Sequence, residues 1–310
     1  MCGIVGYVGA KEAGPILIEG LRRLEYRGYD SAGLTVISPE GRLCTVKEAG
    51  KLAELEGILE EGMPRGTCGI AHTRWATHGA PNRLNAHPHW SHGRDIALVH
   101  NGIFENASVL RSMLIDLGYA FETETDSEAV VHLIDEAFKD NSSLEDAVVA
   151  ALDQVVGAYG IAVVSSRDPG KIVVARKGSP LILGIGEGEI FAASDVSALV
   201  SHTKEVIYLQ DEDVAVIHPG GYLLSNLNSD SILRQTQKVD WDVAAAEKQG
   251  FPHFMLKEIY EQPEAVENAM RGRLIEEEGI SKLGGLNGVH DEFLEMERLI
   301  ILSMGTSYYA

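Results

Sequence analysis

Seven short apolar segments follow one another between residues 160 and 225, and this succession constrains the fold more than any other feature. Each is five to seven residues long and rich in Val, Ile and Leu, as β-strands are. Turn-forming residues separate several of them. The segments are 160–166, 171–176, 180–186, 189–194, 205–209, 213–218 and 221–225.

The first 160 residues mix strand-like and helix-like segments. Residues 33–38 and 42–48 flank the turn sequence PEG, which is typical of a β-hairpin. Residues 13–26 repeat apolar side chains at helical spacing. Further strands are predicted at 4–8, 66–75 and 95–102, and helices at 105–117, 127–139 and 143–155. Strands at both ends with helices between them predict an α+β fold, with two packed sheets covered by helices.

A polar, weakly periodic stretch at residues 226–252 predicts a linker after a first domain at 1–225. Beyond it, residues 253–310 contain helical segments at 253–273 and 291–297, then an apolar run that resembles a strand. A single terminal strand has no sheet of its own, so we expect residues 253–310 to be the start of a further domain.

Composition narrows the function classes. The chain has 310 residues and a formal net charge of −20, which disfavours binding to nucleic acid or to an anionic membrane. No apolar run approaches the ~18 residues that a membrane helix needs, and the start does not resemble a signal peptide. Three scattered cysteines do not form a disulfide framework. We therefore expect a cytoplasmic protein.

Cys2 is the residue that raises a chemical question, because removal of Met1 would leave it with both a thiol and a free α-amine. The amine has an ordinary pKa of roughly 7.7–8.0, so it can accept the thiol proton near neutral pH. One residue would then supply a nucleophile and its base. The alternative is that residue 2 is simply a small residue at the start of a strand.

Three polar stretches accompany this cysteine. Arg74, Thr77 and His78 in HTRWATHG offer donors for a carboxylate. Asn101 and Gly102 in HNGIFEN can form an oxyanion hole. Each stretch also has an ordinary reading, as a loop with capping residues or as an Asn-Gly turn.

Asp126 in TETDSE is the acidic member of the set, and it either caps the helix that follows or binds an ammonium group. Together the three stretches fit one small zwitterionic amino acid. Attack by Cys2 on a side-chain amide of such a ligand would release ammonia.

Two other motifs are weaker. His87, His89 and His92 are close in sequence, as in some zinc sites, but no cysteine pair completes a structural site. Residues 183–189 contain glycines spaced as in a dinucleotide loop, yet a strand follows instead of a helix, which favours a hairpin turn. We expect neither a metal nor any other cofactor.

The chain closely resembles the glutamine:fructose-6-phosphate aminotransferase family along its whole length and in order. The motifs that carry the resemblance are CGIVG, RRLEYRGYDSAG, HTRWATHG, NAHPH, HNGIFEN, GAYG, GSPL, ASD and KEIYEQP. This resemblance implies an N-terminal-nucleophile hydrolase fold, a four-layer α/β/β/α sandwich. It implies that 1–225 is a class II glutamine amidotransferase domain and that 253–310 begins a sugar-isomerase domain.

The resemblance also implies roles for individual residues. Cys2 would form a γ-glutamyl thioester, with Asn101 and Gly102 as the oxyanion hole. The glutamine α-carboxylate would be bound by Arg74, Thr77 and His78, and its α-ammonium by Asp126. Supporting roles fall to Arg27 near the nucleophile, Trp75 as the residue that gates ammonia, and His87 as structural support.

One departure from the family is large, because most of its sugar-isomerase half does not match anything in this chain. Thr306 and Ser307 match only the start of its sugar-phosphate loop, and Met304 stands where the family usually has cysteine. We therefore expect glutamine hydrolysis, with fructose 6-phosphate as a partner only if an isomerase half is supplied. A homodimer is possible. The alternatives are an inactive glutamine-binding remnant and a structural or metal-binding protein.

Overall fold

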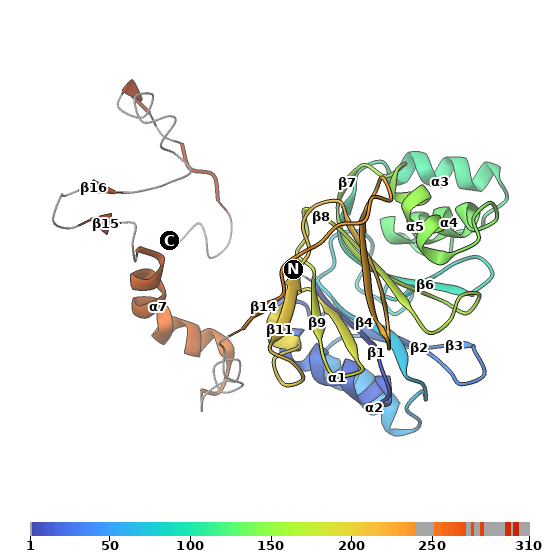
Figure 1. Cartoon of the computed structure of the whole chain (residues 1–310), viewed down its shortest axis with the longest axis horizontal. Coiled ribbons are helices and arrows are strands. Elements are labelled where there is room, and N and C mark those ends of the chain that lie inside the picture. Colours follow the sequence, from blue (N-terminus) through green and yellow to red (C-terminus); the bar gives the residue numbers. More distant parts are fainter. Residues whose placement is uncertain are drawn as a thin grey trace. The chain divides into compact units, whose positions relative to one another are not determined.

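The computed structural model describes residues 2–239, 251–270, 274–275, 280–281, 295–298 and 300–303. The chain divides into two compact units, Met1–Glu247 and Lys248–Ala310. Figure 1 shows both units.

The first unit contains an eight-stranded sheet in which all paired strands are antiparallel. Its spatial order is β14-β11-β9-β10-β1-β4-β2-β3, so the first strand of the chain lies in the middle. The strands are β1 (Gly3–Val8), β2 (Ser31–Ile37), β3 (Leu43–Ala49), β4 (Cys68–Arg74), β9 (Ile182–Ile185), β10 (Ile190–Ala193), β11 (Glu205–Tyr208) and β14 (Gln237–Lys238).

A second, six-stranded sheet is also antiparallel and has the order β13-β12-β8-β7-β6-β5. Its two longest strands, β6 and β7, pair with each other over nine residues. The strands are β5 (His89–Trp90), β6 (Ile96–Phe104), β7 (Gly157–Ser165), β8 (Ile172–Lys177), β12 (Asp213–His218) and β13 (Gly221–Asn226).

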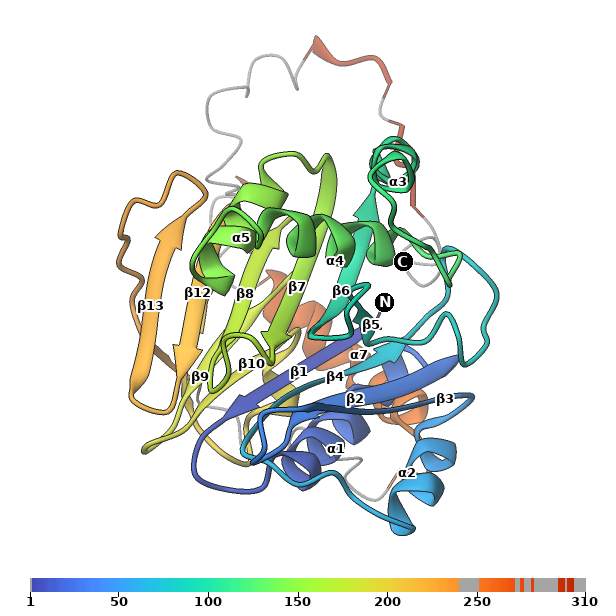
Figure 2. The same ribbon diagram turned by 90° about the vertical axis from the view of Figure 1, so that its right-hand side faces the viewer.

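Helices cover the outer face of each sheet (Figures 1 and 2). Helices α1 (Ala13–Leu24) and α2 (Leu52–Glu60) pack on the eight-stranded sheet. Helices α3 (Ala107–Asp116), α4 (Asp126–Ala137) and α5 (Leu144–Leu152) pack on the six-stranded sheet. Two short 3₁₀ helices lie at Glu25–Arg27 and Val196–Ala198. The predicted four-layer α/β/β/α arrangement is therefore confirmed.

Strand β1 shows why the layers form, because both of its faces are buried. Ile4 and Val8 belong to the core between the two sheets. Val5 and Tyr7 point to the opposite side and belong to the core under α1 and α2. Side chains alternate across a strand, so an unbroken apolar run such as this one suits a strand between two layers.

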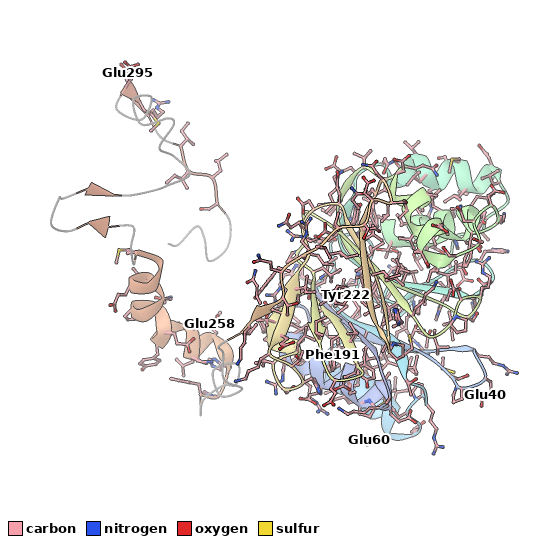
Figure 3. The ribbon with its side chains drawn as sticks, in the orientation of Figure 1. Glu40, Glu60, Phe191, Tyr222, Glu258 and Glu295 are labelled. Carbon is pink, nitrogen blue, oxygen red and sulfur yellow. The ribbon has the colours of Figure 1, made fainter. Side chains whose placement is uncertain are left out.

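The predicted elements of the first unit are present with small shifts at their ends. The hairpin at 33–48 forms as β2 and β3, and Glu40 lies in its exposed turn (Figure 3). The turn at 183–189 joins the antiparallel strands β9 and β10, as expected for a hairpin. Helix α2 and strand β5 were not predicted.

Part of the segment predicted as a linker belongs to the first unit. Strand β14 pairs with β11, and Val239 is buried in the core under α1. Residues 226–239 therefore extend the packed structure past residue 225, because the edge of the eight-stranded sheet offers backbone groups with which a further strand can pair. Residues 240–250 lie outside the described residues.

The second unit contains helix α7 (Phe254–Met270) within the predicted helical segment 253–273, and a two-stranded ladder of β15 (Leu274–Ile275) and β16 (Ile280–Ser281). The predicted helix at 291–297 lies mostly outside the described residues. The predicted terminal strand was wrong for residues 300–303, which are irregular, with Ile300, Ile301 and Leu302 exposed. Among the described strands, none pairs with them.

Met304, Thr306 and Ser307 lie outside the described residues. Within the part that the structure describes, none of the helices combines the length and the apolar content that crossing a bilayer requires.

Candidate functional site

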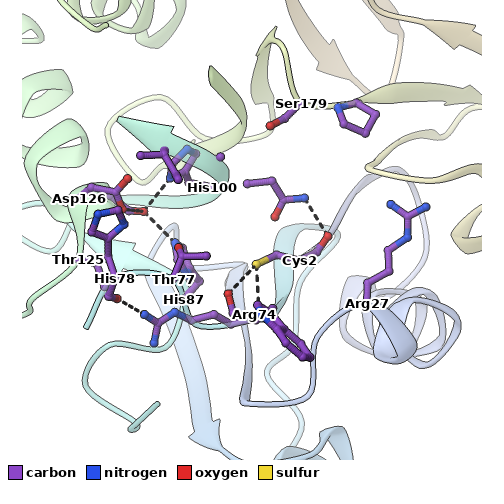
Figure 4. A pocket seen from close by; sticks show the side chains of 16 residues that line it. Cys2, Arg27, Arg74, Thr77, His78, His87, His100, Thr125, Asp126 and Ser179 are labelled. Atoms are coloured by element: carbon purple, nitrogen blue, oxygen red, sulfur yellow. Dashed lines mark hydrogen bonds between the residues drawn. The ribbon is translucent and has the colours of Figure 1, made fainter. Parts of the chain in front are cut away.

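A cavity of about 310 Å³ opens where strands β4 and β6 end and helix α4 begins, beside the residue that precedes β1. Cys2 lies in this cavity, with Asp126, Thr125 and His78 on one side of it and Arg27 on the other (Figure 4). All ten site residues that the sequence predicted within the described part line this cavity: Cys2, Arg27, Arg74, Trp75, Thr77, His78, His87, Asn101, Gly102 and Asp126.

The Cys2 thiol is held by the backbone of Trp75. The Trp75 N–H donates to Cys2 Sγ at 3.2 Å, and the thiol faces the Trp75 carbonyl oxygen at 3.4 Å. Burial raises the pKa of the Cys2 thiol above its ordinary value, while the Trp75 N–H and the Arg74 charge oppose this rise. The thiol is therefore mostly protonated at neutral pH and needs a base to become a nucleophile.

Gly28 supports the peptide that contacts the thiol. A Cβ atom at position 28 would lie 2.7 Å from the Arg74 carbonyl carbon and 2.8 Å from the Trp75 nitrogen. These are backbone atoms, so they cannot move aside without shifting the Trp75 N–H. Glycine at this position thus allows the Arg74–Trp75 peptide to sit where it meets Cys2.

Arg74 is the last residue of β4 and its side chain is buried, although it reaches the loop that follows. Its guanidinium donates to the carbonyl oxygens of Ala80 at 3.2 Å and Gly79 at 3.4 Å, and also to that of His78. A guanidinium has five N–H donors, so donors remain for a ligand in the cavity. Thr77 and His78 are exposed at the rim.

Asn101 lies on β6 between Cys2 and the interior. Its Nδ2 donates to the Cys2 carbonyl oxygen at 3.1 Å, and its Oδ1 lies 3.0 Å from His72 Nε2. His72 Nε2 also lies 3.0 Å from the carbonyl oxygen of His100. The amide of Asn101 therefore connects the residue that bears the thiol to a fully buried histidine.

Gly102 has a backbone conformation that only glycine adopts easily, with φ at +133°. A Cβ atom here would lie 2.0 Å from the carbonyl oxygen of Ala158 on the neighbouring strand. The residue opposite it in the ladder is Tyr159. Position 102 therefore needs glycine for two reasons, its dihedral angle and its contact with β7.

Asp126 is the first residue of α4, and Thr125 is the N-cap. The alternative in which Asp126 caps this helix was therefore wrong by one position. Its Oδ2 instead accepts a hydrogen bond from the Phe104 N–H at 2.9 Å, which ties the end of β6 to the start of α4. The carboxylate lines the cavity and is available as a negative charge there.

Ser127 bridges two buried histidines behind the cavity. Its Oγ lies 3.0 Å from His87 Nε2 and 2.9 Å from His100 Nδ1. Burial lowers the pKa of His100 to about 4 and that of His87 well below its usual range. Both rings are therefore neutral at neutral pH, and each uses one nitrogen to fix its position.

The His87 ring also packs between His72 and His89, with ring centroids 4.2 and 4.4 Å away. His89 in turn contacts the Thr125 hydroxyl at 3.2 Å. Residues of this histidine-rich segment thus serve packing and hydrogen bonding. In the ranges that the structure describes, no group of three or more His, Cys, Asp or Glu side chains is arranged to hold a metal ion.

Lys47 fixes the backbone that carries His87. Its buried ammonium donates to the carbonyl oxygens of Leu84, Ala86 and Pro88 at 3.1, 2.7 and 3.1 Å. Burial lowers the pKa of Lys47 to about 8. One cation on β3 therefore organises three carbonyl groups of the segment that borders the site.

Arg27 and Trp75 also line the cavity. Arg27 makes an ion pair with Asp195, which caps the second 3₁₀ helix, and its Nε donates to the Tyr26 hydroxyl at 3.0 Å. The Trp75 side chain is 44% exposed and meets Tyr29 edge-on at 5.4 Å. Arg27 thus contacts protein groups, whereas Trp75 is open to solvent at the rim.

Six lining residues were not predicted as site residues, although all six lie inside the motifs HNGIFEN, TETDSE and GSPL. His100 precedes Asn101 and Gly102, and Thr125 and Ser127 flank Asp126. The other unpredicted lining residues are Ile103, Ser179 and Pro180. His72 was missed as well, although it is the first residue of the HTRWATHG motif.

Comparisons with known proteins agree with this arrangement. Residues 72–201 match the model of a family described as glutamine amidotransferase domain. The whole chain is 50% identical to a glutamine–fructose-6-phosphate aminotransferase (isomerizing) of Chlorobaculum tepidum, of which it covers 51%. It is 49% identical to that of a Thermus thermophilus strain and covers 50% of it. The chain thus spans about half the length of the curated relatives that it matches.

A solved structure shares the fold at lower identity. The glutamine phosphoribosylpyrophosphate amidotransferase of B. subtilis, complexed with ADP and GMP, aligns with a TM-score of 0.64 and 27% identity. The alignment covers 74% of this chain and 50% of that one. The predicted N-terminal-nucleophile hydrolase fold is confirmed by this likeness. The chain is therefore similar over its whole length to about half of a glutamine–fructose-6-phosphate aminotransferase, and residues 72–201 match the glutamine amidotransferase domain family.

Proposed function

We propose that this chain hydrolyses the side-chain amide of glutamine to glutamate and ammonia, with Cys2 as the nucleophile. The observation that carries the proposal is the Cys2 thiol, which lies in a cavity beside the Asn101 amide and opposite a carboxylate and a guanidinium. The α-ammonium of a free amino acid matches the Asp126 carboxylate, and its α-carboxylate matches the Arg74 guanidinium.

The base in this proposal is the α-amine of Cys2 itself. Among the described residues, the thiol sulfur has hydrogen bonds only to the backbone of Trp75, and no side-chain base reaches it. His87 and His100 line the cavity, but each has a ring nitrogen bonded to Ser127. Removal of Met1 would free an amine within the same residue as the thiol.

The steps follow from these groups. The α-amine takes the thiol proton, and Sγ attacks the amide carbon of glutamine. Asn101 Nδ2 and the Gly102 N–H stabilise the oxyanion that forms. The α-amine then returns its proton to the leaving nitrogen, ammonia departs, and a γ-glutamyl thioester remains. Water attacks this thioester, releases glutamate and restores the thiol.

Binding of the substrate uses the two charged borders of the cavity. Arg74, with Thr77 and His78 at the rim, binds the α-carboxylate, and Asp126 binds the α-ammonium. Arg27 and His87 support the walls of the site. Trp75 lies at the open rim, where it gates the departure of ammonia.

The aminotransfer named for the curated relatives is a wider proposal. It requires fructose 6-phosphate and the remaining half of those proteins, for which Thr306 and Ser307 would form the first part of a phosphate loop. Where an additional chain or domain supplies that half, we propose that ammonia from this site aminates the sugar phosphate.

The test is ammonia release from glutamine by two forms of the chain that differ only at the amino terminus. One form has lost Met1, as shown by intact mass, and the other carries an additional residue before Cys2. We expect turnover from the first form only, because an amide nitrogen cannot act as a base. Alkylation of Cys2 by iodoacetamide checks that the thiol is accessible in both forms.

Equal turnover from the two forms would contradict the α-amine as base. Glutamine binding by calorimetry without turnover, in the form that lacks Met1, would instead identify a glutamine-binding domain.

A further inference from the structure

We infer that His72 is a positioning residue whose ring N–H sets the orientation of the Asn101 amide toward the reacting centre. The inference deepens the proposed function, on which its catalytic reading rests. It begins from the three polar atoms that meet in the interior behind Asn101: His72 Nε2, the His100 carbonyl oxygen and Asn101 Oδ1.

The position of the ring proton follows from the carbonyl group. The His100 carbonyl oxygen can only accept a hydrogen bond, and it lies 3.0 Å from His72 Nε2. The proton of the neutral ring therefore resides on Nε2. His72 Nδ1 is buried and has no hydrogen-bond partner among the described residues, so a proton there would be an unsatisfied donor.

The orientation of the Asn101 amide follows in turn. A donor at His72 Nε2 requires an acceptor 3.0 Å away, which is Oδ1. The two N–H donors of Nδ2 then face Cys2, where one bonds the Cys2 carbonyl oxygen at 3.1 Å. A flipped amide would oppose two donors on one side and two oxygens on the other.

The environment keeps this arrangement fixed. His72 is 0% exposed and lies on β4, while Asn101 is on β6 of the other sheet. The His72 ring packs against the His87 ring, which is held in place by a hydrogen bond to Ser127. The hydrogen bond between His72 and Asn101 thus crosses from one sheet to the other directly behind the thiol-bearing residue.

Two matched substitutions separate this role from a packing role. In His72→Gln the side-chain amide extends to where Nε2 lies and retains a donor. In His72→Asn the same chemical group is one methylene shorter and falls short of Asn101. We expect His72→Asn to lower kcat for glutamine hydrolysis by roughly 10²-fold, the usual loss when an oxyanion donor is misplaced, with KM nearly unchanged. His72→Gln should recover most of this loss.

The double variant His72→Asn/Asn101→Ala gives the decisive comparison. If His72 acts through Asn101, the double variant is no slower than Asn101→Ala alone. Alkylation of Cys2 by iodoacetamide needs no oxyanion hole, so its rate should stay within about threefold of the unsubstituted chain in every variant. Additive losses in the double variant, or alkylation that falls in parallel with kcat, would overturn the inference.

A measurement that needs no turnover separates this inference from the proposed function. A long-range ¹H–¹⁵N spectrum of the histidine rings reports which nitrogen of His72 carries the proton. We expect the proton on Nε2, and the ring signals that disappear in His72→Asn are those of His72. A proton on Nδ1 would overturn the inference even in an active chain, whereas absent turnover with an Nε2 proton would count against the proposed function alone.

Discussion

The floor and the rim of the cavity are built in different ways. The floor consists of Cys2, Arg74, Asn101 and Gly102, which lie in or next to paired strands, and the buried His72 lies directly behind Asn101. The rim consists of Trp75, Thr77 and His78, which are exposed and lie in the loop after β4. The two regions are continuous in sequence, because Trp75 directly follows Arg74.

The difference between floor and rim shows which interactions fix the positions of the residues in each. Strand pairing sets the floor, since Thr73 is opposite Gly3 in β1 and Arg74 is opposite Ser31 in β2. The rim depends on the Arg74 guanidinium, which binds the carbonyl groups of His78, Gly79 and Ala80. We therefore expect substitutions in the floor to affect chemistry or folding, and substitutions in the rim to affect binding.

The largest expected effect is at Cys2. Cys2→Ala should reduce glutamine hydrolysis by more than about 10⁴-fold, because no other group can form the thioester. Cys44→Ala is the matched control, since Cys44 is a half-buried thiol on β3 that does not line the cavity. Ammonia release measures both, and residual activity in Cys2→Ala above that level would refute the nucleophile.

The next largest effect is at Gly102 in the floor. Gly102→Ala should lower the free energy of unfolding by several kcal/mol, because it combines a φ of +133° with a Cβ contact of 2.0 Å. Gly41→Ala is the control, with a φ of +77° and open space around the position. It should cost only about 1 kcal/mol. Equal losses in urea denaturation would show that the contact with Ala158 does not matter.

Arg74 connects floor and rim, so its substitution tests the boundary between them. Arg74→Lys keeps the charge but loses the planar fork that reaches three carbonyl groups. We expect KM for glutamine to rise by about 30- to 100-fold while kcat falls less. Arg42→Lys, after the β2–β3 turn and outside the cavity lining, is the control. A loss confined to kcat would place Arg74 in the chemistry instead of in binding.

Acid should destabilise the folded chain through the buried histidines behind the cavity. Burial lowers the pKa of His72 to about 3 and that of His100 to about 4. Below a pH of about 6.5 these histidines bind protons in the unfolded chain but stay neutral in the folded chain. The free energy of unfolding therefore falls as the pH decreases from there toward about 4. The slope should be at least about 1.4 kcal/mol per pH unit. Urea denaturation at several pH values measures it.

A matched variant sharpens the acid prediction. His72→Gln removes one of the buried histidines that are protonated only in the unfolded chain. It should therefore reduce the slope of the unfolding free energy against pH below a pH of about 6.5. An unchanged slope in this variant would mean that other groups cause the acid sensitivity.

The smallest expected effect is at His78 in the rim. The His78 carbonyl oxygen holds Arg74, and substitution of the side chain leaves that contact in place. His78→Ala should raise KM by about three- to tenfold and leave kcat and thermal stability unchanged. Steady-state kinetics measure both constants. A fall in kcat of more than about tenfold would show that His78, although in the rim, takes part in the chemistry.

Sequence alone predicted many of the residues that line this cavity, because they stand in polar stretches at the ends of apolar segments. Arg74, Asn101 and Gly102 end or nearly end their strands, and Asp126 begins a helix, so their motifs were visible without a structure. The layers were predictable for a similar reason, since apolar strands such as 4–8 need cover on both faces.

The positioning residues could not be predicted in this way. His72 and Asn101 are 29 residues apart on different sheets, and His87 and Ser127 are 40 apart, so their contacts depend on how the sheets and helix α4 pack together. Helix α2 was missed because it is short and contains Gly57, which lowers helix propensity. The run at 300–302 showed that apolar composition alone does not make a strand.

The two buried faces of β1 also limit how this chain can change in length. Ile4 and Val5 point into different cores, so deletion of one residue between Cys2 and Val8 would exchange their surroundings and misalign the cysteine with Trp75. The turn at residues 38–42 has no such constraint. Natural relatives of this chain should therefore include some with insertions at that turn, while the number of residues in the first strand stays constant.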